Sequence, residues 1–196
     1  MDPTLEDTVI ADTRRWLERA VIGLNLCPFA KGVEAKGQIH FAVSRAQDER
    51  GVLSDLQREL QALAEANPEQ RDTTLLMLPF AFQDFLAFND FLELADDLVE
   101  TMDLAGILQV APFHPRFQFA GTAPQDASNN TNRAPYPTLH LLREASIDRA
   151  VEQFPEAETI FERNIEVVET LGAEGWAALD VGARCPVHPT DPQEPQ

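Results

Sequence analysis

The heptapeptide Thr73–Pro79, TTLLMLP, decides the fold of this chain. It is a short apolar run without polar alternation, which is typical of a strand buried on both faces of a sheet. Gly106–Pro112 (GILQVAP) is predicted to be a second strand, and the alternating segment Gln38–Ser44 (QIHFAVS) a third. Between these strands lie 47–66 and 84–102, where apolar residues recur at spacings of three and four, as on one face of a helix. Helices therefore alternate with strands on both sides of TTLLMLP.

The rest of the chain adds helices and one ambiguous segment. Further helices are predicted over 5–25, 146–154 and 156–171, with a loop over 28–37. Thr138–Leu142 is predicted to be either a short strand or the first turn of a helix. This alternation predicts an α/β (or α+β) fold, in which helices pack on a mixed, partly parallel sheet of three to five strands. We expect one globular domain over 1–180 and a Pro-rich C-terminal tail over 181–196.

Two strand–helix–strand units, 38–79 and 73–112, are expected to be right-handed crossovers, which makes their strands parallel. In sheets of this kind, binding sites form in the loops beyond the carboxyl ends of the strands. His114 lies just past the carboxyl end of the predicted strand Gly106–Pro112. We therefore expect a binding site among the residues that follow this strand.

The composition of the chain limits its partners. Its 196 residues carry a formal net charge of −18, whereas a protein that neutralises phosphates needs a basic face. We therefore expect no nucleic acid partner and no binding to anionic membranes. The N-terminus has no apolar signal core, no segment is long and apolar enough to span a bilayer, and Cys27 and Cys185 lie far apart in the sequence. These features predict a cytoplasmic protein and leave its oligomeric state open.

The stretch from Phe113 to Glu144 is where we expect the functional site. Its hydrophobic periodicity is broken, and its arginines outnumber its carboxylates within a strongly acidic chain. A local group of arginines can bind a small anion despite a distant acidic field. We predict a protein that acts on or binds a small anionic metabolite, a carboxylate or a phosphate. The predicted catalytic residues are His114, His140 and Cys27, and the predicted substrate-binding residues are Arg116, Asn130, Asn132, Arg133, Tyr136 and Arg143.

Several of these residues have a structural alternative. Cys27 follows a predicted helix, whose negative C-terminal end disfavours a thiolate, so it is either a nucleophile beside a histidine or a small buried residue. His114 is either an acid–base group or a side chain bonded to its own loop. The run from Asn129 to Arg133 is either an anion site or a loop built on the turn-forming tendency of asparagine.

Two other functions remain open. A metal-dependent enzyme is one, because His40, His114 and His140 are candidates for three imidazole ligands, and Cys185 and His188 have ligand-like spacing. Nothing in these spacings requires a metal, and the common nucleotide-binding motifs are missing from the sequence, so we predict no metal and no cofactor. The other alternative is a non-catalytic interaction module that binds a basic surface through the acidic helix 84–103.

Three segments are distinctive as strings: GLNLCPFAK (23–31), QVAPFHPRFQFAG (109–121) and NNTNRAPYPTLHLLRE (129–144). In them the chain resembles a bacterial family catalogued as a domain of unknown function, DUF1415. The resemblance extends over nearly the whole length. It implies a single-domain bacterial protein of the cytoplasm, and it assigns no activity, cofactor or catalytic role to any residue.

Overall fold

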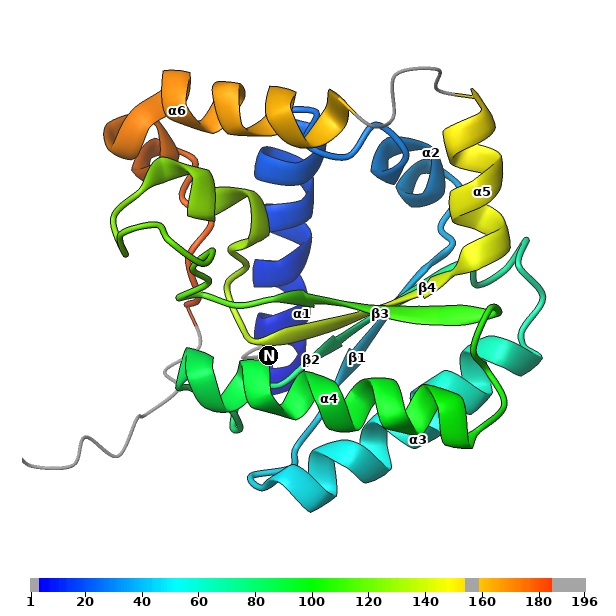
Figure 1. Ribbon diagram of the computed structural model, residues 1–196. Coiled ribbons are helices and arrows are strands. Elements are labelled where there is room, and N and C mark those ends of the chain that lie inside the picture. Colours follow the sequence, from blue (N-terminus) through cyan, green and yellow to red (C-terminus); the bar gives the residue numbers. More distant parts are fainter. Residues whose placement is uncertain (1–3, 154–158, 185–196) are drawn as a thin grey trace, which may run out of the picture.

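The computed structural model describes residues 4–153 and 159–184 and contains one four-stranded sheet, in the order β1-β2-β4-β3 (Figure 1). The strands are β1 (Ile39–Val43), β2 (Thr73–Met77), β3 (Leu108–Phe113) and β4 (Thr138–Arg143). β1 and β2 are parallel, whereas β4 is antiparallel to both of its neighbours, β2 and β3. The predicted α/β fold with a mixed, partly parallel sheet is confirmed, as is the burial of every residue of β2.

One feature of the strand order was not predicted from the sequence. β2 and β3 run in the same direction, as expected of a crossover, but they are not neighbours, because β4 inserts between them. The ambiguous segment 138–142 therefore forms a central strand. Its alternation explains why: Leu139 and Leu141 are fully buried on one face of the sheet, and His140 lies on the other.

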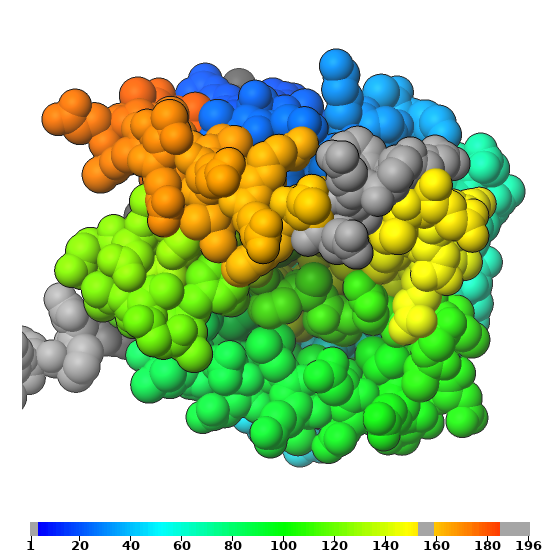
Figure 2. Space-filling view, turned by 45° about the horizontal axis from the view of Figure 1, so that its top comes forward, coloured from blue at the N-terminus to red at the C-terminus, as the bar shows by residue number. Residues whose placement is uncertain are grey.

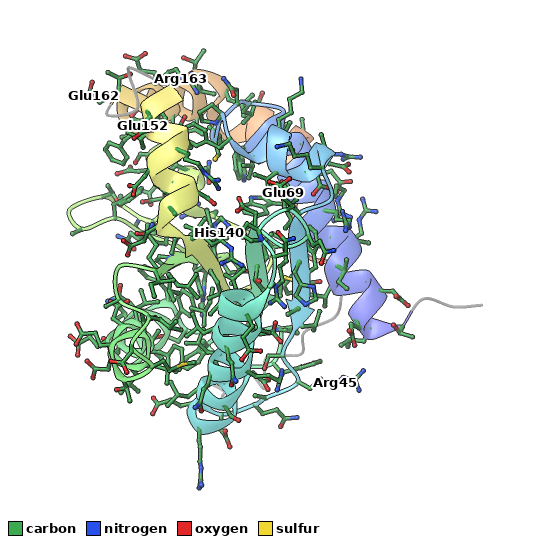
Figure 3. The ribbon with its side chains drawn as sticks, turned by 90° about the vertical axis from the view of Figure 1, so that its right-hand side faces the viewer. Arg45, Glu69, His140, Glu152, Glu162 and Arg163 are labelled. Atoms are coloured by element: carbon green, nitrogen blue, oxygen red, sulfur yellow. The ribbon has the colours of Figure 1, made fainter. Side chains whose placement is uncertain are left out.

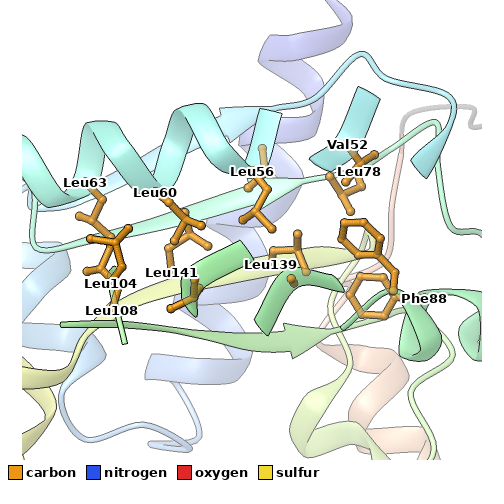
Figure 4. Close-up of a cluster of buried hydrophobic side chains, with 14 of the residues drawn as sticks. Val52, Leu56, Leu60, Leu63, Leu78, Phe88, Leu104, Leu108, Leu139 and Leu141 are labelled. Carbon is orange, nitrogen blue, oxygen red and sulfur yellow. The ribbon is translucent and has the colours of Figure 1, made fainter. Parts of the chain in front are cut away.

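Helices α3 (Glu49–Glu65) and α4 (Phe85–Thr101) cover the first face of the sheet (Figure 1). Asp48 and Asp84 cap their N-termini by accepting backbone N–H hydrogen bonds. The apolar side chains on one face of α3 pack against leucines of β3 and β4 in one buried cluster (Figure 4). This cluster includes Leu56, Leu60, Leu63, Leu108, Leu139 and Leu141. Burial of each such side chain stabilises the fold by roughly 1.5–3 kcal/mol.

The N-terminal helix of the chain packs on the second face of the sheet. α1 (Leu5–Trp16) begins with a capping box between Thr4 and Asp7, and it continues as a π-helical turn, η1 (Leu17–Ile22). Trp16 and Leu17 pack here in a cluster with Leu75 of β2. The predicted helix 5–25 is thus present as far as Ile22, with a change of helical type that its apolar spacing did not indicate.

Three further helices lie on this side of the sheet: α2 (Ala30–Ala35), α5 (Glu144–Gln153) and α6 (Ile160–Ala178) (Figure 1). α2 lies within the segment that was predicted to be a loop, and that prediction is wrong for these six residues. α6 is interrupted at Gly172, whose φ of 65° is a left-handed conformation that glycine adopts without strain. Among the described residues, no helix is both long and apolar enough to cross a membrane.

Candidate functional site

A cavity of about 420 Å³ lies on the face of the sheet that carries α1, α2 and α5. Strands provide its floor, and η1, α2 and α5 contribute to its walls. Figure 2 shows a hollow in the surface below α6, in orange, and beside α5, in yellow, with green residues under it. The lining is mostly apolar and includes Trp16, Val21, Phe29, Leu75, Phe113 and Ile147.

Polar side chains interrupt this apolar lining at a few points. They are Cys27, Asp72, Thr73, His140, Arg143 and Ser146. Three of the nine residues predicted from the sequence are therefore brought together here, namely Cys27, His140 and Arg143. The remaining six are not among the residues that line this cavity.

His140 lies on the floor of the cavity, at the centre of the sheet (Figure 3). Its neighbours across the strands are Leu75 of β2 and Ala111 of β3. The Nε2 atom is 2.8 Å from Oγ1 of Thr73, and that hydroxyl also donates to the carbonyl oxygen of Leu141 at 2.6 Å. Burial lowers the pKa of His140 to about 4, so its imidazole is neutral at pH 7.

Cys27 lies between η1 and α2 and is half-buried. It lines the same cavity as His140. Beside it, η1 contributes Leu17 and Val21 to the wall.

Arg143 is hydrogen-bonded to backbone carbonyl groups at and after the C-terminal end of α3. Its Nη2 atom donates to the carbonyl oxygens of Leu63, Ala66 and Arg71, and the Ala66 contact is 2.8 Å long. Leu63 and Ala66 lie at the C-terminal end of α3, where helix carbonyl groups lack partners within the helix. Burial lowers the pKa of Arg143, and the nearby carboxylate of Asp72 opposes this effect. The guanidinium thus adds positive charge to the cavity wall while its Nη2 atom is occupied by backbone carbonyl oxygens.

A polar groove, also of about 420 Å³, adjoins the apolar cavity. The two share Phe29, Val33, Asp72, Ser146 and Ala150 as lining residues. The other polar side chains of the groove are Lys36, Gln38, Glu69 and Arg149. Arg149 donates to Oγ of Ser146 at 2.9 Å, and Ser146 donates to Asp72 at 2.6 Å. The apolar cavity therefore opens beside a groove that has charges of both signs.

Residues 8–178 match the family described as "Protein of unknown function (DUF1415)". The chain belongs to the DUF1415 family. The comparisons with curated proteins and with solved structures gave no match.

His114 of this DUF1415 chain is placed elsewhere, against α4. It is 1% exposed and packs between the rings of Phe85 and Phe88. Its Nε2 atom donates to the carbonyl oxygen of Phe82 at 2.9 Å, and Nδ1 accepts the backbone N–H of Arg116 at 3.0 Å. Because both ring nitrogens have protein partners, the contacts are those of the structural alternative, a histidine bonded within the protein.

The remaining predicted anion ligands hold the loop that precedes β4. Arg133 donates to the carbonyl oxygens of Phe117 and Pro124 and to Oδ1 of Asn130, at 3.2, 2.6 and 3.2 Å. Arg116 donates to the carbonyl oxygen of Gln83. The side-chain oxygen of Asn132 accepts from Thr131. These groups are used in ordering η2 (Ala127–Asn132) and its surroundings, and nothing brings them to the cavity.

Tyr136 is buried and joins a network that the sequence did not indicate. Its hydroxyl donates to Oδ2 of Asp12 at 2.7 Å, and the same oxygen accepts the backbone N–H of Arg184 at 2.6 Å. Arg15 pairs with the other carboxylate oxygen at 2.9 Å. Burial favours a raised pKa for Asp12, but these hydrogen bonds and the charge of Arg15 outweigh it and lower the pKa. The network fixes the end of the described chain to α1.

The alternative functions rest on other regions. Among the described residues, no three His, Cys, Asp or Glu side chains are grouped so as to hold a metal ion. Cys185 and His188 lie outside the described residues. The acidic side chains on the outer face of α4, such as Asp90, Glu93 and Asp97, are exposed to solvent.

Sequence reasoning missed Thr73, Lys36 and Arg149. Thr73 sits in an apolar strand run, where a threonine is unremarkable. The two cations lie in different segments that become neighbours only when α2 and α5 approach each other on the folded sheet.

Proposed function

We propose that this protein binds, and as an enzyme acts on, a small molecule with an apolar body and an anionic group. The apolar body occupies the cavity above the sheet, and the anionic group lies in the adjoining polar groove. One observation carries the proposal: a cavity with an almost entirely apolar lining is continuous with a groove that contains Lys36 and Arg149. This proposal keeps the anionic ligand predicted from the sequence but moves the charged contact to different residues.

Support for the apolar body comes from the size and lining of the cavity. Small-molecule sites occupy roughly 300–1,000 Å³ and are mostly apolar, with a few placed polar groups. The cavity has about 420 Å³ and includes the aromatic rings of Trp16, Phe29 and Phe113. Such a space favours a molecule that loses apolar surface to the protein on binding.

Support for the anionic group comes from the local balance of charge. The joined cavities are lined by three cations, Lys36, Arg143 and Arg149, and by two carboxylates, Asp72 and Glu69. Positive charges are thus in excess here, although the whole chain carries −18. Charges beyond about 8–10 Å are largely screened at physiological salt, so the local excess governs the choice of ligand.

Chemistry at this site would fall to Cys27 and His140, the thiol and the imidazole of the lining. A neutral imidazole can accept a proton, and a thiol can attack an electrophilic carbon once it is deprotonated. The cytoplasm remains the proposed location, because a reduced Cys27 suits a reducing compartment. The strong negative charge of the chain supports the absence of nucleic acid and anionic membranes among its partners.

Calorimetric titration with straight-chain carboxylates, from acetate to decanoate, tests the proposal. Affinity should rise by about fourfold for each methylene added, which corresponds to roughly 0.8 kcal/mol, and should level off once the cavity is full. Ala150→Phe, which projects into both spaces from α5, should abolish this dependence on length. Ala87→Phe on the exposed side of α4 is the matched control. An affinity that ignores chain length, or that Ala150→Phe leaves unchanged, would refute the proposal.

A further inference from the structure

We propose that His140 presents an unprotonated Nδ1 atom to the cavity, so that the bound molecule donates a hydrogen bond to it from an O–H or N–H group on its apolar body. This inference rests on the proposed function and narrows its ligand class. The molecule would then be an apolar acid that also carries a hydroxyl, phenol or N–H group. Three features of the site support it.

The first feature is the direction of the hydrogen bonds around Thr73. A threonine hydroxyl has one proton to donate. A carbonyl oxygen can only accept, so the 2.6 Å contact with Leu141 uses this proton. The hydroxyl must therefore accept in its 2.8 Å contact with Nε2 of His140. The ring thus carries its proton on Nε2.

The second feature is the free state of the other ring nitrogen. A neutral imidazole protonated on Nε2 has a lone pair on Nδ1. In the described part of the chain, Nδ1 of His140 has no hydrogen-bond partner. His140 is also partly exposed and lines the cavity, so its ring is not sealed from solvent.

The third feature is the apolar surroundings of this acceptor. The ring of Phe113 lies 6.0 Å from the ring of His140, and Leu75 and Ala111 are its neighbours on the sheet. When a ligand displaces water from such surroundings, a hydrogen-bond acceptor that is left unpaired weakens binding. A ligand that donates a hydrogen bond to this acceptor therefore binds more tightly. An anionic oxygen would instead face a lone pair. The anionic group must consequently point toward the groove, away from His140.

Phenol and toluene form a matched pair of probes, because they differ only by a hydroxyl in place of a methyl group. The quantity to measure is the ratio of their affinities, in the wild type and in His140→Leu. The affinity for phenol divided by the affinity for toluene should be about tenfold higher in the wild type than in His140→Leu. A site with a hydrogen-bond acceptor discriminates strongly in favour of a ligand that carries the donor. Comparing ratios removes the different hydrophobicity of the two probes.

Thr73→Val tests whether the threonine fixes the ring. It should reduce the preference for phenol while binding of toluene persists, whereas Thr101→Val, at the exposed end of α4, should change neither. A phenol-to-toluene ratio that is the same in the wild type and in His140→Leu would overturn the inference and leave the cavity as a binding site. Binding of neither probe would overturn the proposed function and, with it, the ligand class inferred here.

A measurement on the unaltered protein guards against variants that fail to fold. Nitrogen-15 NMR of the histidine rings at pH 7 should show Nε2 of His140 protonated and Nδ1 bare, and phenol should shift the Nδ1 resonance while toluene leaves it in place. A proton on Nδ1, or an Nδ1 resonance that phenol does not move, would overturn the inference.

Discussion

Thr73 and His140 approach each other diagonally across β2 and β4, with 2.8 Å between Oγ1 and Nε2. Their strand partners are different residues, Leu142 for Thr73 and Leu75 for His140. The contact places the polar groups of a buried threonine and a partly exposed histidine together on the floor of an apolar cavity. It also makes a neutral histidine part of the folded state.

Stability should therefore depend on pH through His140. Its pKa is about 4 in the folded protein and 6.5 in the unfolded chain, so the unfolded state binds more protons between these values. The free energy of unfolding should fall as pH drops from about 6.5 to about 4. The loss is at most about 3 kcal/mol, and water in the cavity reduces it.

The comparison that isolates this effect is with His140→Gln, because burial also lowers the pKa of His114 and His40. Urea denaturation at a series of pH values should show a smaller loss of stability in the variant. Parallel curves for the two proteins would mean that His140 does not titrate with folding.

Arg133 should matter for stability and not for ligand binding. Its guanidinium donates to three oxygens of the loop, so Arg133→Met should lower the free energy of unfolding by about 1–3 kcal/mol. Carboxylate affinity should stay as in the wild type. Arg50→Met, at an exposed position, is the control for loss of charge. Weaker carboxylate binding in Arg133→Met alone would restore this residue to the anion site predicted from the sequence.

Lys36 and Arg149 should select the anionic group. The double substitution Lys36→Gln/Arg149→Gln should weaken decanoate binding by about fivefold, which corresponds to two exposed ion pairs of roughly 0.5 kcal/mol each. Affinity for the uncharged alcohol decanol should not change. The pair Lys31→Gln/Arg50→Gln removes the same charge outside the groove, and calorimetry should find both ligands unaffected. An equal effect of the two double substitutions would point to net charge instead of a local contact.

Cys27 should be protected by a ligand in the cavity. In a Cys185→Ser background, alkylation of Cys27 by N-ethylmaleimide should slow by about tenfold when decanoate occupies roughly nine-tenths of the sites. Propionate at the same concentration should leave the rate nearly unchanged, because it buries little apolar surface. The rate is followed by mass spectrometry. Equal rates with and without decanoate would place Cys27 outside the bound region.

The fold was largely predictable because its strands and helices have strong local patterns. The apolar run at 73–77 and the alternation at 39–43 each predict a strand without further information. The insertion of β4 between β2 and β3 was not predictable. It depends on pairing between residues far apart in the chain, such as Leu76 with Leu139. Local periodicity carries no information on such partners.

The candidate site was less predictable, for a physical reason. Polar residues in an irregular segment indicate either a ligand site or a loop that must satisfy its own backbone groups. Arg133 serves the second purpose, since carbonyl oxygens accept two of its three hydrogen bonds. His140 lies in a regular strand, where its face depends on register. Only the folded sheet shows that it shares a cavity with Cys27.

The most direct test of the central claim is a crystal structure of the protein with decanoate. The account predicts electron density for the alkyl chain above His140, between Cys27 and Phe113, with the carboxylate near Lys36 and Arg149. Density for decanoate elsewhere on the protein, or a cavity closed by its own side chains, would contradict it.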